Sequence, residues 1–264
     1  MPTPTPTVTD APPAADLHGL IGHAVFAGLC NLIPVPFVDD WVRDGIRRRM
    51  VRRELESSPV ELDAKRVQVL ACGYDPITAK GCLGGCLTRI FKIPVDFVFK
   101  LVFKKIFRKI FFFLAVKDCV DTFSAVFHEG FLIRHALGRE HVCAHCLGPG
   151  TTFDDAVSLR GKIEAVRDEV DHRPVERWAA QAFRGSGRLL RQTARLLNKT
   201  LGKLRRQGDL PDEQVFAEVD PEHGKLNSMI DELAEEISGE ASYLADLTRR
   251  LDRRLDPRSE ETVS

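Results

Sequence analysis

The sequence predicts an all-α protein in which an N-terminal apolar helical bundle precedes a C-terminal antiparallel helical hairpin with heptad character. Apolar residues recur every three to four positions through most of the 264 residues, and helix-capping residues precede several of these segments. No segment shows convincingly the two-residue alternation that is typical of a half-buried strand.

The composition fits a folded protein of one large or two ordinary domains, with 44% hydrophobic and 29% charged residues. We expect a disordered Pro/Thr-rich lead-in at 1–15, an apolar, Phe-rich basic helical domain at 16–148, a charged helical hairpin at 149–256 and a disordered tail at 257–264. The lead-in lacks the basic start of a secretory signal, so the sequence predicts a cytoplasmic protein with reduced cysteines.

The first apolar segment, Leu17 to Val38, contains no Asp, Glu, Lys or Arg and is just long enough to span a bilayer. Two histidines, one asparagine and three glycines interrupt it, and Pro34 ends the helix. Three interpretations stay open for this segment: a buried core helix, a hairpin that dips into the membrane, and a true membrane span.

Two further helices follow in the N-terminal half. The first has Asp39 or Asp40 as its N-cap and ends near Glu56. Its apolar face carries Val42, Ile46 and Met50, and the remainder carries Arg43, Arg47, Arg48, Arg49, Arg52 and Arg53. Ser58-Pro59-Val60-Glu61 has the spacing of a capping box with Pro at the first helical position, which predicts the next helix up to about Cys72.

The run AVFAGLCNLIPVPFVD, from Ala24 to Asp39, joins the apolar helix to the basic helix through an Ile-Pro-x-Pro turn. It resembles the helical hairpin of EcsC-like and GTPase-appended membrane-associated domains, and Ile93-Pro94-Val95-Asp96 is similar to the same turn. The resemblance covers Leu17 to Glu56 and implies a helical, membrane-linked architecture without catalytic residues. The sequence contains no GTPase module of the kind that often accompanies such hairpins.

Phenylalanine and positive charge are concentrated in one part of the chain. Eleven of the sixteen phenylalanines fall between Phe91 and Phe131, and eight basic residues but only one acid lie between Arg89 and Lys117. A cationic helix with large apolar rings is typical of a segment that lies on an anionic lipid surface. The predicted membrane-binding residues are Arg89, Lys92, Phe97, Phe99, Lys100, Phe103, Lys104, Lys105, Phe107, Arg108, Lys109, Phe111, Phe112 and Phe113.

This segment is not expected to cross the bilayer. Between Phe97 and Val116, fourteen strongly apolar residues favour insertion by roughly 4–8 kcal/mol, whereas five cations oppose it by roughly 12–17 kcal/mol. A position in the interface keeps the Phe burial and adds about 1 kcal/mol of attraction per cation. We therefore expect the rings between 89 and 131 to face lipid headgroups, including Phe123, Phe127 and Phe131 on a second helix from about Val116 to Leu137.

The alternative is a soluble all-α adaptor or assembly subunit, in which the Phe-rich segment is internal core and its cations reach out to the rim.

Beyond residue 150 the sequence predicts three helices. Thr151 or Thr152, with Asp154 or Asp155 three residues later, starts the first. Its apolar positions are Leu159, Ile163, Val166 and Val170. Pro174 opens the second, with Val175, Ala179, Ala182, Ser186, Leu189, Thr193 and Leu196 on one face. The third runs from about Pro221 to Leu255 and contains one four-residue step too many, a stutter, near Glu240.

Opposite charges on the last two helices predict that they fold back on each other as the antiparallel hairpin. The second helix carries the predicted partner-binding cations Arg184, Arg188, Arg191, Arg195 and Lys199, and the third carries Asp231, Glu232, Glu235, Glu236 and Glu240. We expect this hairpin to serve self-association or a protein partner. Nucleic acid is not the expected partner, because aromatic residues are sparse among these cations.

The one dense group of soft metal ligands is His141-Val142-Cys143-Ala144-His145-Cys146. Cys143 and Cys146 have the gap of two zinc thiolates, and His141 or His145 could add a nitrogen, so a zinc-binding domain or enzyme is one hypothesis. A helix-end turn with incidental thiols is the other, because no second Cys pair has matching spacing. His128-Glu129 departs from the zinc-protease pattern, and no nucleotide-binding or hydrolase motif occurs, so we expect no cofactor other than this zinc and no enzymatic activity.

Overall fold

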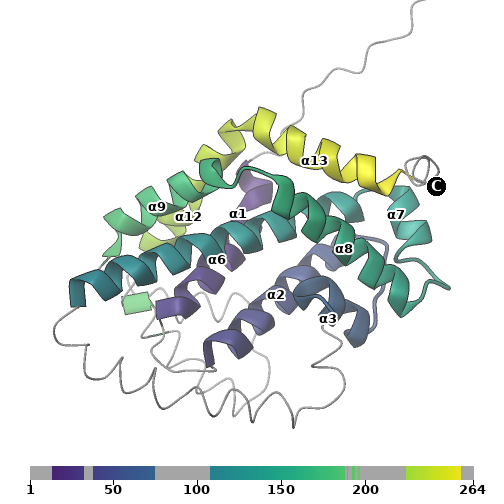
Figure 1. Ribbon diagram of the computed structural model, residues 1–264, viewed down its shortest axis with the longest axis horizontal. Helices are drawn as coiled ribbons and strands as arrows, with labels where there is room; N and C mark the ends of the chain where they lie inside the picture. The colour runs from purple at the N-terminus through teal and green to yellow at the C-terminus, as the bar shows by residue number, and fades with distance from the viewer. Residues whose placement is uncertain are drawn as a thin grey trace, which may run out of the picture.

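The computed structural model (Figure 1) describes residues 14–32, 38–74, 108–187 and 224–256 and a few positions between 189 and 196, without the side chains of 14–16, 38–41 and 108–113. Within these ranges the chain forms nine α-helices, one short 3-10 helix and no strand. This confirms the predicted all-α class.

The helices are α1 (Ala14–Leu29), η1 (Cys30–Leu32), α2 (Val38–Glu56), α3 (Ala64–Cys72), α6 (Arg108–Leu137), α7 (Glu140–His145), α8 (Phe153–Glu169), α9 (Arg173–Gly185), α12 (Lys225–Gly239) and α13 (Ala241–Leu255). Helix α6 contacts α1, α2, α7, α8, α9 and α13. It crosses the middle of the molecule, with α13 along one edge and α2 and α3 towards the other (Figure 1). Most of the other helices are therefore positioned by their contacts with α6.

Helix α1 is a buried core helix. Its side chains from Leu20 to Leu29 are buried almost completely, and it packs against α2, α6 and α12. At Gly28 the backbones of α1 and α6 come so close that a Cβ atom would lie 2.7 Å from the Cys119 carbonyl oxygen. Over the described part of this segment, residues 17–32, the core helix is the interpretation that is observed. No helix in the described ranges is long and apolar enough to cross a membrane.

Helix α2 ends at Glu56 as predicted, but it begins at Val38, so the predicted N-caps Asp39 and Asp40 lie inside its first turn. Helix α3 begins later than predicted. The residues after Ser58 are not helical, and the Ser58 hydroxyl is buried without a hydrogen-bond partner among the described groups, so it caps no helix. Asp63 is the N-cap instead, and its Oδ1 accepts from the Arg66 backbone N–H at 3.1 Å. Val60 is buried in the core ahead of this cap. The predicted end at Cys72 is confirmed.

The expectation that the rings of α6 face lipid is wrong for three of them. Phe123, Phe127 and Phe131 are buried and follow one another in stacked pairs, with ring centroids 6.3 and 6.0 Å apart. Phe183 of α9 meets Phe123 edge-on at 5.9 Å. These rings face inward because α1 and α9 cover this part of α6. Burial of each ring contributes about 1.5–3 kcal/mol.

Local sequence signals place the starts of α8 and α9. Thr152 and Asp155 form a capping box at the start of α8, as predicted, and Pro174 lies in the first turn of α9. The predicted apolar positions of α8, Leu159, Ile163, Val166 and Val170, are buried. In α9 the buried face includes Phe183, whereas the predicted Ala182 is only partly buried.

The single helix predicted up to Leu255 is two helices in the structure. Helix α12 ends at Gly239 and α13 begins at Ala241, so the break falls at the predicted stutter near Glu240. The break allows α12 to pack against α1 and α9 while α13 packs against α6 and α8. The hydrophobic core therefore continues across the boundary expected between residues 148 and 149.

Candidate functional site

Most of the predicted membrane-binding residues lie outside the described residues. These are Arg89, Lys92, Phe97, Phe99, Lys100, Phe103, Lys104, Lys105 and Phe107. Arg108, Lys109, Phe111, Phe112 and Phe113 belong to the first turns of α6, where the backbone alone is described. Within the described ranges, the large hydrophobic side chains that are exposed are Tyr74 (48%) and Leu114 (46%). They flank the segment 75–113 on its two sides.

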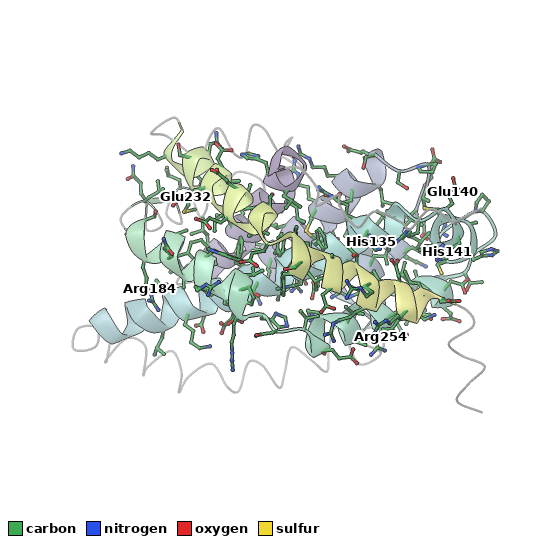
Figure 2. All side chains as sticks on the ribbon, turned by 90° about the horizontal axis from the view of Figure 1, so that it is seen from above. His135, Glu140, His141, Arg184, Glu232 and Arg254 are labelled. Carbon is green, nitrogen blue, oxygen red and sulfur yellow. The ribbon has the colours of Figure 1, made fainter. Side chains whose placement is uncertain are left out.

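The predicted partner-binding cations are described only in part. Arg184 is exposed near the end of α9, whereas Arg188, Arg191, Arg195 and Lys199 lie outside the described residues. Helix α12 contacts α9 and exposes Asp231, Glu232, Glu235 and Glu236. Figure 2 shows Arg184 and Glu232 towards the same end of the molecule.

The predicted zinc ligands lie on and just after α7, at the opposite end from Arg184 (Figure 2). His141 and His145 are exposed, the Cys143 thiol donates to the Leu137 carbonyl oxygen at 3.0 Å, and burial raises the pKa of the Cys146 thiol. The described side chains include no group of three or more His, Cys, Asp or Glu that could hold a metal ion. Zinc stays a prediction, which elemental analysis of the purified protein tests.

Glu129, in the C-terminal half of α6, is a buried carboxylate surrounded by arginines. Its side chain is 1% exposed, and its Oε1 lies 3.0 Å from a terminal nitrogen of Arg160 and also accepts from Arg167. A terminal nitrogen of Arg47 lies 3.6 Å from Oε2. The arginines come from α2 and α8, so the carboxylate joins both helices to α6. Arg160 is held further by the Leu70 carbonyl oxygen at 2.8 Å.

His128, the neighbouring residue, joins α6 to the C-terminal helix. It is fully buried, its Nδ1 lies 2.5 Å from the Ser124 carbonyl oxygen, and its Nε2 lies 2.5 Å from the Tyr243 hydroxyl of α13. A carbonyl only accepts, so Nδ1 carries the proton and Nε2 accepts from Tyr243. Burial, with a smaller contribution from the charge of nearby His172, lowers the pKa of His128 to about 3, and burial raises the pKa of Tyr243. Both groups are therefore neutral at pH 7.

We call the buried residues Ser124, His128, Glu129, Arg160 and their partners Arg47, Arg167, His172 and Tyr243 the α6 polar cluster. The Ser124 hydroxyl lies 3.4 Å from His128 Nδ1 and 3.3 Å from His172 Nδ1, distances that invite comparison with a nucleophile and its base. Ser124 and His128 are enclosed, however, and His128 Nδ1 is already donating to a carbonyl. The arrangement suits the positioning of helices and not the attack on a substrate.

The sequence interpretation missed the α6 polar cluster. His128 and Glu129 resemble the start of the zinc-protease pattern but lack its second histidine, since position 132 is Leu. The sequence does contain a signal for this cluster: His128 and Glu129 are two consecutive polar residues between Phe127 and Phe131 in a mainly apolar stretch of the helix. Such residues require buried partners.

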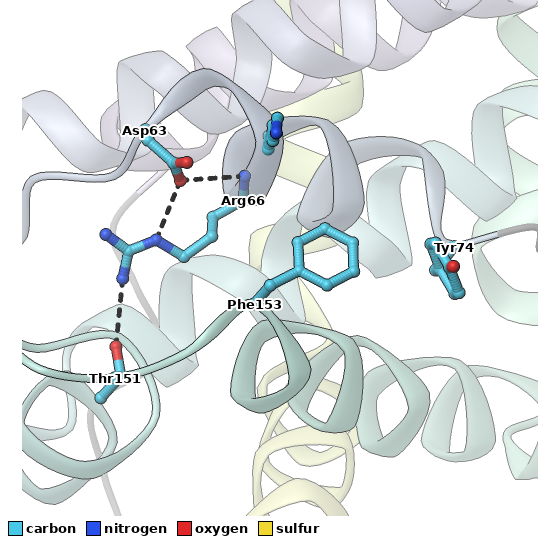
Figure 3. Close-up of a pocket in the computed structure, with 6 residues that line it drawn as sticks. Asp63, Arg66, Tyr74, Thr151 and Phe153 are labelled. Carbon is cyan, nitrogen blue, oxygen red and sulfur yellow. Dashed lines mark hydrogen bonds and ion pairs between the residues drawn. The ribbon is translucent and has the colours of Figure 1, made fainter. Parts of the chain in front are cut away.

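A surface hollow of about 480 Å³ lies between the starts of α3 and α8 (Figure 3). Arg66 crosses it, donating to Asp63 Oδ1 at 2.9 Å and to the Thr151 hydroxyl at 3.1 Å. The Tyr74 and Phe153 rings meet edge-on in its wall at 5.3 Å. Its main charges already pair with each other, so the hollow serves as a junction between α3 and α8 and is assigned no ligand.

The assignment of a function depends on these geometric observations and on the sequence. Comparison of the chain with protein-family models, curated proteins and solved structures found no match.

Proposed function

We propose that this is a non-enzymatic, membrane-associated helical protein whose segment 89–113 docks on an anionic membrane, at its cytoplasmic inner face. The observation that carries the proposal is the density of phenylalanine and cations in this segment, with eight basic residues against one acid between Arg89 and Lys117. In the proposed mode of binding, the rings enter the interface and the cations contact lipid phosphates, each adding about 1 kcal/mol of attraction.

The described structure limits which phenylalanines of α6 belong to the proposal. Phe123, Phe127 and Phe131 are buried between helices, so lipid contact is confined to the residues that precede them in α6. Leu114, one of the exposed large apolar side chains noted above, directly follows the proposed docking segment in the chain. The helical core then serves as the scaffold that carries this segment.

The C-terminal helices belong to the same proposal as a charged antiparallel hairpin for self-association or for a protein partner. Its basic side consists of Arg184, Arg188, Arg191, Arg195 and Lys199, and its acidic side consists of the exposed carboxylates of α12. The contact between α9 and α12 supports a hairpin, because α9 begins the basic side and α12 carries the acidic side.

Co-sedimentation with lipid vesicles tests the membrane proposal. We expect the protein to pellet with vesicles that contain phosphatidylserine and to be released by salt, but to pellet poorly with neutral phosphatidylcholine vesicles. The triple variant Lys100→Glu, Lys104→Glu, Arg108→Glu should lose this binding. A matched control with Arg173→Glu, Arg177→Glu and Arg253→Glu makes the same charge change at exposed positions of α9 and α13 and should keep it. Equal pelleting with both kinds of vesicle contradicts the electrostatic part of the proposal.

The second candidate function is a soluble all-α adaptor or assembly subunit. It is favoured by the burial of the three phenylalanines of α6 that were expected to face lipid. Size-exclusion chromatography with light scattering in the absence of detergent discriminates between the two candidates. A homogeneous oligomer that does not bind vesicles supports the adaptor function.

A further inference from the structure

We propose that the surface of a docked anionic bilayer crosses helix α6 between Leu114 and Asp118. This inference rests on the proposed membrane association and specifies where, on the described part of α6, contact with lipid ends. The occupant is the anionic lipid surface, to which the basic residues between Arg89 and Lys117 are complementary in charge.

One side of α6 changes character within two turns. Leu114 is exposed, followed on the same side by Lys117, Asp118 and Asp121, with the Lys117 and Asp121 side chains 64% and 47% exposed. Residues three, four and seven apart share a helix face, so these four form one stripe that is apolar at its start and charged afterwards. Val116 and Cys119, which lie between them in sequence, are buried.

The charges of the stripe set the limit of lipid contact. Leu114 gains from entering the interface, whereas the Asp118 carboxylate is repelled by anionic headgroups, and both Asp118 and the Lys117–Asp121 ion pair are costly to bring into hydrocarbon. Lys117 does not neutralise Asp118, because its ammonium group is paired with Asp121 at 2.5 Å. The bilayer surface is therefore favoured on the N-terminal side of Asp118.

Helix α6 cannot rotate to present a different face to the lipid. The Asn31 side-chain amide of η1 donates to the Asp118 carbonyl oxygen at 2.8 Å and to the Thr122 hydroxyl at 2.7 Å. One turn away, Gly28 of α1 packs directly on the Cys119 backbone. These contacts fix the stripe relative to α1, so the position of the boundary is a property of the folded core.

Fluorescence quenching by brominated lipid locates the boundary. Leu114→Trp and Asp121→Trp are compared with the parent chain, whose two tryptophans supply a common background. Vesicles of phosphatidylcholine and phosphatidylserine carry bromine on the acyl chains. We expect the tryptophan at position 114 to add a quenched component and the tryptophan at position 121 to add none. As a second measure, Leu114→Asp should lower the vesicle-bound to free ratio about tenfold, whereas Asp121→Asn should not lower it.

The outcomes separate this inference from the proposed function. If the protein pellets with anionic vesicles but position 121 is quenched as strongly as position 114, the boundary is wrong and the membrane association stands. The same holds if the protein pellets, position 114 is not quenched and Leu114→Asp binds normally. If the parent chain does not pellet at all, both proposals are overturned. Circular dichroism of each variant confirms its helical fold, which substitution of these exposed side chains should leave intact.

Discussion

The Tyr243 hydroxyl of α13 lies 2.5 Å from Nε2 of His128 of α6, a contact between residues 115 positions apart in the chain. It provides the buried imidazole with a donor that no residue of its own helix supplies. The hydrogen bond therefore fixes α13 on the central helix in one position.

Tyr243→Phe should lower the free energy of unfolding by about 1–3 kcal/mol, because it leaves Nε2 of a fully buried histidine without a donor. Urea unfolding followed by circular dichroism measures the change. Tyr74→Phe is the matched control, since Tyr74 is exposed, and should change stability by less than about 0.5 kcal/mol. A comparable loss in both variants would show that the buried hydrogen bond is not the cause.

Stability should fall on mild acidification. Burial lowers the pKa of His128 to about 3 and that of His23 to about 4, whereas histidines of an unfolded chain titrate near 6.5. As the pH falls below 6.5, the unfolded state binds protons that the native state excludes, so stability present above 6.5 is lost progressively towards these lower values. Each histidine contributes up to about 1.4 kcal/mol per pH unit in this range.

Urea unfolding at pH 7, 6 and 5 measures this slope, and His128→Gln should reduce it by about half. His141→Gln, at an exposed position of α7, should leave the slope unchanged. An unchanged slope in His128→Gln would assign the acid sensitivity to other groups.

Glu129→Gln should destabilise the protein by about 3–5 kcal/mol, because the arginines around Glu129 lose their buried counter-charge. Glu164→Gln removes the other carboxylate that pairs with Arg160, at 2.7 Å, but its side chain is 39% exposed. It should cost less than about 1 kcal/mol. The free energies of unfolding of the two variants decide whether burial sets the strength of these pairs, and equal losses contradict this.

Gly28→Ala should destabilise the protein by about 1–3 kcal/mol, because the added methyl group meets the backbone carbonyl of Cys119 and one helix must shift. Gly161→Ala is the matched change on α8, where nothing lies within 4 Å, and should stabilise the protein by up to about 1 kcal/mol. Thermal unfolding of both variants provides the comparison. A stabilised Gly28→Ala variant would be incompatible with the close packing of α1 and α6.

Helix boundaries were predictable where the signal depends on atoms within one turn. The capping box of Thr152 and Asp155 starts α8 as the sequence predicts, and the stutter near Glu240 marks the break between α12 and α13. The similar capping-box motif at Ser58 does not start a helix. The residues that follow it up to position 63 are not helical, and Val60 among them packs into the core. Local propensity lost to tertiary packing at that position.

The α6 polar cluster and the direction of the α6 rings depend on partners distant in sequence. Arg167 is 38 residues from Glu129, and Tyr243 is farther still from His128. An apolar, Phe-rich helix with some charge has the same composition whether its rings meet lipid or other helices. The packing of α1 and α9 against α6 decides which of these the rings contact, and the sequence of α6 alone carries no information about that packing.

The position of α13 has a consequence for synthesis on the ribosome. This helix covers parts of α6 and α8, which precede it in the chain by more than sixty residues and emerge first. Until α13 leaves the exit tunnel, His128 lacks its hydrogen bond from the Tyr243 hydroxyl. The apolar surface that Leu244, Leu247 and Leu251 cover in the native structure is then exposed. A nascent chain that has exposed α6 and α8 but not yet α13 therefore leaves apolar surface uncovered, which is the kind of surface that makes partly folded chains prone to aggregation.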